Sequence, residues 1–261
     1  MNAALVESLL RDVEDPGPLV QELWVFHHWL VARASRFAVG SIAEAPAGDL
    51  CRGDTDLSAW QGRRVRDVVR EGLSSPEVVH RAAAMACLNA SVRMAPSAWE
   101  GNAMDPFAEA IRHEPSCFVG HFDDAAVWRD AGCPVTIVEL EPRPGDVHWR
   151  DADEALERAS LVFITGQTLL NDTFEQVVAR TPNARSRILM GPTCPASARL
   201  LQHGVHVVGG TAVTDADRLL RYLQYGGTSM RKAPAGAVRQ FNIVAPGALS
   251  GLSSRGMRQD Q

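Results

Sequence analysis

A histidine, several carboxylates and a thiol follow short apolar stretches of the chain, and together they could do chemistry. His121 lies within Gly120-His121-Phe122-Asp123, and an imidazole titrates near neutrality, which suits an acid–base catalyst. The same imidazole, with carboxylates and a thiol, could hold a soft or borderline cation. The candidate metal donors are His121, Asp123, Glu141, Asp146 and Cys194.

A second group of residues at these positions could bind a ligand through hydrogen bonds or through open backbone. Its members are Gly120, Phe122, Glu141, Thr165, Gly166, Gln167, Thr168, Asn171, Gly191, Pro192 and Thr193. Taken singly, the glycines are also expected in tight turns, and the threonines and the asparagine in helix caps. Their occurrence after successive apolar stretches is what favours a binding site.

Two familiar motifs are missing from the sequence. No G-x-G-x-x-G follows the first apolar stretch, where His121 and Phe122 take the place of the glycines that would cradle a pyrophosphate. The chain also lacks the G-x-S-x-G elbow of hydrolases. Glu139 or Glu141 does lie about twenty residues after Gly120, the spacing at which a carboxylate meets a ribose hydroxyl. NAD-dependent hydride transfer is therefore disfavoured, whereas an adenosine-type ligand stays open.

The apolar stretches predict an alternation of strands and helices from about residue 115. Strands are expected at 116–120, 134–140, 160–165, 186–191, 205–209 and 239–244. Helices are expected at 123–131, 151–159, 172–180, 195–203 and 214–225, with caps at Asp172 with Glu175 and at Thr214 with Asp217. Short apolar strands that alternate with helices predict an α/β, doubly wound, Rossmann-like parallel sheet. Its strands would deliver the candidate residues to one edge.

The first hundred residues read as a smaller α+β unit. A helix is expected at 3–13, a hairpin of two strands at 23–33 and 36–43, a loop at 44–58 and helices at 60–73 and 76–92. His27 and His28 would then lie on opposite faces of a strand, which makes them a poor metal chelate. We expect an α+β domain at 1–110, a Rossmann-like domain at 111–248 and a disordered tail at 249–261.

Composition limits the partners and the location of the protein. The net charge is −5 without a long basic stripe, which argues against nucleic acid as a partner. No apolar stretch is long enough to span a membrane, and the start of the chain is not a signal peptide. Five scattered cysteines indicate reduced thiols, so we expect a cytoplasmic protein. Six tryptophans leave room for an exposed apolar patch and a homodimer.

Several runs of the sequence resemble the DUF364 family, which is associated with heavy-metal chelation. They are CFVGHF, VELEPRPGD, FITGQTLLNDTFEQVV and MGPTCPASARLLQHGVHVVGG, within residues 115–230. The run AAAMACLNAS (82–91) is similar to a helix end of the partner domain DUF4213, which adds Asn89 to the ligand-binding candidates. The resemblance implies a first domain like the enolase N-terminal domain, a Rossmann-like second domain and a site between them. Asp123 and Cys194 depart from the usual family pattern.

Three hypotheses follow. In the first, the cleft between the domains binds a small polar ligand, a transition metal ion or a metallophore precursor. In the second, the chain is an enzyme that acts on an adenosyl or amino-acid-derived substrate, such as S-adenosylmethionine, in a metallophore or natural-product pathway, and His121 is its acid–base catalyst. In the third, the chain is an interaction module without catalysis. The sequence therefore leaves open whether the protein is an enzyme.

Overall fold

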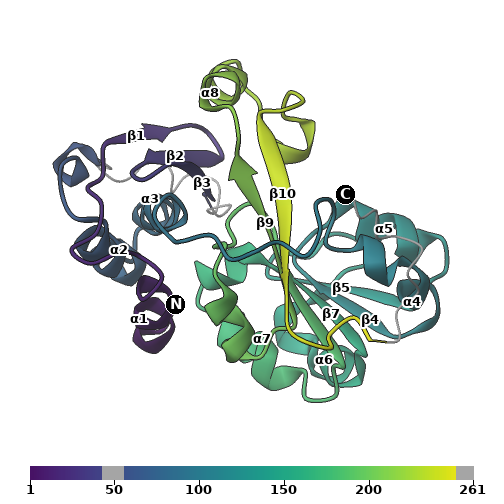
Figure 1. Ribbon diagram of the computed structural model, residues 1–261. Coiled ribbons are helices and arrows are strands. Elements are labelled where there is room, and N and C mark those ends of the chain that lie inside the picture. The colour runs from purple at the N-terminus through teal and green to yellow at the C-terminus, as the bar shows by residue number, and fades with distance from the viewer. Residues whose placement is uncertain (43–55, 251–261) are drawn as a thin grey trace.

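The larger part of the chain folds around a seven-stranded sheet, shown by a computed structural model that describes residues 1–42 and 56–250 (Figure 1). The order across the sheet is β10-β9-β8-β7-β4-β5-β6, and every neighbouring pair is parallel except β10 with β9. The strands are β4 (Ser116–Val119), β5 (Val135–Glu139), β6 (Val147–His148), β7 (Leu161–Thr165), β8 (Ser186–Met190), β9 (Val207–Val213) and β10 (Val238–Val244). The strand order reverses between β4 and β7, as in a doubly wound fold, so the predicted Rossmann-like sheet is confirmed.

One helix precedes the first of these strands, and four others lie in the connections between them. They are α4 (Ala108–His113), α5 (Asp123–Asp130), α6 (Asp153–Arg158), α7 (Phe174–Arg180) and α8 (Ala216–Gln224). The expected helix at 195–203 is instead a 3-10 helix at Ala198–His203. The two predicted caps are wrong. Asp172 has a positive φ of 62° and precedes α7, while Asp215 caps α8 by accepting a hydrogen bond from the backbone N–H of Arg218.

The smaller part pairs a three-stranded antiparallel sheet with helices (Figure 1). Its elements are α1 (Ala3–Leu10), β1 (Glu22–Val25), β2 (Trp29–Arg33), β3 (Phe37–Ser41), α2 (Val65–Ser74) and α3 (Val78–Asn89). The expected strand at 23–33 is broken by a turn, so the predicted hairpin is a three-stranded meander. His27 and His28 fall in that turn with ring centroids 4.1 Å apart, and the expectation that they lie on opposite faces is wrong. Much of the predicted loop at 44–58 and of the tail lies outside the described residues.

Apolar packing joins the two parts. One buried cluster contains residues of α1 and α3 as well as of β7 and β8, and another sets Trp29 and Val31 of β2 against Leu219 and Leu223 of α8. The β9–β10 ribbon carries α8 toward the small sheet (Figure 1). In the described part of the chain, no helix is long and apolar enough to cross a bilayer. The division into domains at residue 110 stays a prediction.

Candidate functional site

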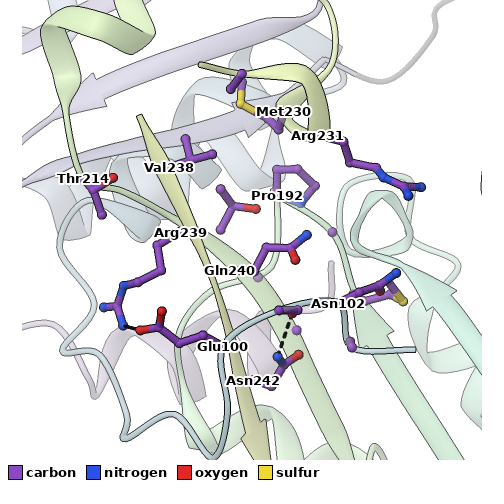
Figure 2. Close-up of a pocket in the computed structure, with 18 of the residues that line it drawn as sticks. Glu100, Asn102, Pro192, Thr214, Met230, Arg231, Val238, Arg239, Gln240 and Asn242 are labelled. Atoms are coloured by element: carbon purple, nitrogen blue, oxygen red, sulfur yellow. Dashed lines mark hydrogen bonds and ion pairs between the residues drawn. The ribbon is translucent and has the colours of Figure 1, made fainter. Parts of the chain in front are cut away.

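A pocket of about 820 Å³ opens at the carboxyl ends of β8 and β9, against β10 (Figure 2). This volume lies in the range of small-molecule sites, and the edge is where open α/β sheets bind ligands. Apolar side chains line much of it, namely Met104, Phe122, Met190, Pro192, Met230 and Val238. Its polar side chains include Asn102, Thr211, Thr214 and Gln240.

Asn242 on β10 builds one wall of this pocket. Its side chain is fully buried, and its amide nitrogen donates to the carbonyl of Trp99 at 3.2 Å. It also donates to the carbonyl of Gly101 at 3.0 Å, the bond that is dashed at Asn242 in Figure 2. These bonds fasten the segment before α4 to the sheet. Gly209 is opposite Asn242, and a side chain there would come within 2.7 Å of the Cβ of Ala103. The wall therefore depends on an amide at 242 and on a glycine at 209.

Charged groups at the pocket are already paired. Arg239 donates to Glu100, and Arg231 reaches across to Asp124 of α5 at 3.1 Å. Three of these side chains are exposed and Asp124 is partly buried, and surface pairs of this kind contribute only about 0–1 kcal/mol. The pairs can therefore rearrange at low cost when a charged ligand enters.

Three of the predicted ligand-binding residues line this pocket: Phe122, Gly191 and Pro192. Gly191 has a φ of 128°, a conformation that side chains disfavour, so its position after β8 needs glycine. Phe122 follows β4 and packs against Phe118 at the same edge. These three predicted residues therefore lie at the pocket, and their role in binding stays a prediction.

Another three predicted residues meet between the two parts of the fold. Gln167 donates to the hydroxyl of Ser41 on β3 at 2.6 Å, and the backbone N–H of Ser41 donates to the Thr193 hydroxyl at 3.2 Å. Asn89, at the end of α3, donates to the carbonyls of Val39 and Thr193 at 3.0 and 3.1 Å. Within the described residues, the side-chain oxygens of Asn89 and Gln167 are buried without a hydrogen-bond partner. This junction joins residues that the sequence placed far apart.

Other predicted residues make local contacts. The Thr168 hydroxyl donates to the carbonyl of Thr165 at 2.7 Å, and the Asn171 side chain accepts from Thr173. A side chain at either of two glycines would collide with a neighbour, because Gly120 lies against Thr165 and Gly166 lies against Cys194. These contacts fit the local turn and cap roles that such residues have without a ligand. A role of these residues in binding stays a prediction.

The five candidate metal donors do not converge. His121 Nδ1 lies 3.9 Å from Asp146 Oδ2, but Asp146 is already bound to Arg129 at 2.7 Å and accepts from the backbone N–H of Arg143. Asp123 and Glu141 are exposed, and burial raises the pKa of the Cys194 thiol, which disfavours the thiolate that binds metal. In residues 1–42 and 56–250, no three His, Cys, Asp or Glu side chains are grouped to hold a metal ion.

His121 itself is held near the switch point of the sheet. Its backbone N–H approaches the Glu139 carboxylate, whose pKa is raised mainly by burial. Its Nδ1 is buried and has no hydrogen-bond partner among the described residues. A catalytic role for His121 stays a prediction.

Sequence reasoning missed the residues that β10 and the segments beside it bring to the pocket. Asn102, Arg231, Arg239, Gln240 and Asn242 line it without following a strand of the parallel sheet. The strand at 239–244 was expected, but nothing in its residues indicated that it pairs antiparallel with β9. The available signal for the pocket was the presence of three polar residues, Arg239, Gln240 and Asn242, in an otherwise apolar strand.

Comparison with known proteins assigns the chain to a family. The sequence model of DUF364, described as "Putative heavy-metal chelation", matches residues 102–241. The chain is similar over its whole fold to two crystal structures of DUF364 proteins of unknown function. That from Desulfitobacterium hafniense has a TM-score of 0.78 at 20% identity, over 93% of this chain and 98% of the other. That from Pyrococcus horikoshii has a TM-score of 0.71 at 13% identity, over 93% and 97%.

An uncharacterized protein of Methanocaldococcus jannaschii is 40% identical over 76 residues, which is 29% of each chain. The match therefore spans less than a third of the length of this curated relative. The likeness to the two solved structures carries the fold alone, because both are below 25% identity. The matched family sequence covers more than half of the chain, so this protein is a member of the DUF364 family.

Proposed function

We propose that the protein binds a small organic ligand in the pocket beside β10, and that a metal reaches it as part of that ligand. The pocket supports this proposal by its volume, by its place at the carboxyl edge of the sheet and by its mixture of apolar walls with amide and hydroxyl groups. The family description points to metal chelation, but the candidate donor side chains do not fit a metal ion. A chelating metallophore or its precursor would supply the missing donors itself.

A second candidate function is an enzyme that acts on an adenosyl or amino-acid-derived substrate such as S-adenosylmethionine. The observation that favours it is the topology, because the pocket lies at the edge where Rossmann-like sheets bind nucleosides. Phe122 lines the pocket, and its chain neighbour His121 is the candidate acid–base group. We also propose a cytoplasmic location and a homodimer. Both rest on the composition of the chain.

The pocket is tested by filling it with a side chain. Gln240 is exposed on β10 and lines the pocket, so Gln240→Trp should obstruct it without disturbing the core. Gln224→Trp, at the exposed end of α8 and away from the pocket, is the matched control. Tag-free protein would be titrated by calorimetry with Ni²⁺ or Zn²⁺ alone, with their nitrilotriacetate and nicotianamine chelates, and with S-adenosylmethionine.

Binding of a chelate that is lost in Gln240→Trp and kept in Gln224→Trp supports the metal-bearing ligand. The same pattern with S-adenosylmethionine supports the enzyme instead. Stoichiometric binding of the free metal that survives in Gln240→Trp but disappears in His121→Ala contradicts the proposal, because protein side chains would then be the chelator. At a hundred times its Kd, a ligand should also stabilise the fold by about 2.7 kcal/mol.

A further inference from the structure

A second groove, of about 580 Å³, lies between the carboxyl-terminal end of α8 and the 3-10 turn at Met230–Lys232. It shares Pro234 with the pocket described above and none of that pocket's other lining residues. Figure 1 shows α8 at the extremity of the β9–β10 ribbon, beyond the carboxyl ends of the parallel strands. The groove is therefore a separate surface.

The composition of this groove is unusual for this chain. The protein has two tyrosines, Tyr222 and Tyr225, and one lysine, Lys232, and all three line the groove. Arg218 and Arg221 complete its charged side chains. The Tyr225 side chain is the most exposed of the large apolar residues described, at 84%. Tyrosine and arginine are the residue types that dominate protein–protein hot spots.

The charge of the groove is positive although the protein is negative overall. Arg218 is paired with Asp215 at 3.4 Å. Among the residues described here, no carboxylate lies within 4 Å of Arg221 or Lys232. On a chain of net charge −5, Arg221 and Lys232, which have no ion-pair partner in the described part of the chain, form a local positive site beside two aromatic rings. Such a site attracts an acidic partner electrostatically.

The walls of the groove are held in place before any partner binds. The Tyr222 hydroxyl donates to the carbonyl of Ser229 at 2.9 Å, and Gly227 lies directly on the Tyr222 ring. The indole N–H of Trp29 donates to the carbonyl of Thr228 at 3.0 Å, which ties the loop to the small sheet. A preformed surface loses little conformational entropy on binding. Tyr225, in contrast, is left exposed at the rim of the groove.

We propose that this groove docks an acidic segment of a partner protein, with carboxylates at Arg221 and Lys232 and an apolar side chain on Tyr225. A protein segment is favoured over a small anion because the groove is open to solvent along its length and its aromatic ring projects from the surface. Small-molecule sites bury most of their ligand instead.

The single lysine makes the proposal directly testable. The probe is a fluorescein-labelled twelve-residue peptide of repeated Glu-Glu-Gly, with a Gln-Gln-Gly peptide as its uncharged counterpart. A carbodiimide would join a bound carboxylate to the Lys232 amine, and the site of the new amide would be read by mass spectrometry. Affinity would be measured by fluorescence anisotropy at low and physiological salt, with AMP as a competing small anion.

We expect the acidic peptide to bind, to form its amide at Lys232 and to weaken as salt rises. The double variant Arg221→Ala/Lys232→Ala should lose at least about tenfold in affinity. Lys232→Arg should keep the affinity and lose the cross-link. The control double variant Arg11→Ala/Arg150→Ala removes two exposed arginines elsewhere and should change nothing.

Three results would overturn the proposal. They are equal loss of affinity in both double variants, cross-linking at the amino terminus without Lys232, and displacement of the peptide by equimolar AMP, which would make the groove a site for nucleotides. A normal thermal unfolding curve for each variant excludes misfolding as the cause. Because the groove and the pocket are separate, failure here leaves the Gln240→Trp experiment unaffected.

Discussion

Single residues at the pocket have structural roles that their residue type alone does not indicate. Asn242 was not a candidate, yet its amide holds the wall segment through two carbonyls and is itself fully buried. Asp146 was a candidate metal donor, yet it is occupied by Arg129. A side chain's type limits what it can do, but its neighbours determine which of those interactions it makes.

Replacing Asn242 should therefore loosen the pocket wall. Asn242→Ala removes both donors and leaves the carbonyls of Trp99 and Gly101 without them, which we expect to lower the free energy of unfolding by about 1–3 kcal/mol. Urea denaturation measures this change. Gln240→Ala, exposed on the same strand, is the control and should stay within about 0.5 kcal/mol of the wild type. Equal stability of both variants would show that the wall does not depend on Asn242.

At the scale of elements, the close approach of β3 to α3 sets how the small sheet meets the rest of the protein. The alanines of α3 permit this approach, and Gly40 of β3 makes it closer still, since a Cβ there would lie 2.3 Å from the carbonyl oxygen of Ala82. The same strand ends at Ser41, which bonds Gln167 and Thr193. The junction between the two parts is thus positioned by backbone contact.

Gly40→Ala should separate these elements. A backbone carbonyl cannot give way as a flexible side chain can, so we expect a loss of about 3 kcal/mol or more. Gly132→Ala is the comparison, because Gly132 has a φ of 83° in open space and should cost only about 1–2 kcal/mol of backbone strain. Chemical denaturation measures the free energy of unfolding of both variants and so compares the two losses. A smaller loss at Gly40 than at Gly132 would mean that β3 can move off α3.

The doubly wound class of the sheet and most element positions could be predicted from sequence, because apolar strands that alternate with helices admit few topologies. The helix caps could not be predicted from sequence. Asp172 forms an ion pair with Arg81 at 2.6 Å and takes a positive φ, so it does not cap α7. The break between β1 and β2 was also missed, because the turn at residues 26–28 contains neither glycine nor proline and apolar residues flank it on both sides.

At the scale of the whole molecule, the two parts share a buried core, so local changes are expected to affect global unfolding. His206 precedes β9, and its Nδ1 accepts from the backbone N–H of Arg187 at 3.0 Å. Burial, with the nearby Arg187 guanidinium, lowers the pKa of His206 below its ordinary value. The folded protein therefore favours the neutral ring.

This shift predicts a pH dependence of stability. Because the unfolded chain takes up the proton at a higher pH than the folded one, stability from His206 is fully present above about pH 6.5 and is lost as the pH falls toward the folded value. His206→Asn keeps an acceptor for the Arg187 N–H and should flatten the loss between pH 7.5 and pH 5. Urea midpoints across that range test it. If the urea midpoints of the wild type and of His206→Asn fell in parallel with pH, this prediction would be contradicted.

The sequence by itself determined the class of fold and the edge of the sheet where small and polar residues gather, because strand and helix periodicities are local properties of the chain. It also indicated Phe122, Gly191 and Pro192 as residues of that edge. Only the tertiary structure decided which candidates lie together. The pocket is completed by an antiparallel strand and by segments distant in sequence, while Asn89, Gln167 and Thr193 instead form a junction with β3. Contacts between distant segments depend on packing, and packing leaves no periodic signal in the chain.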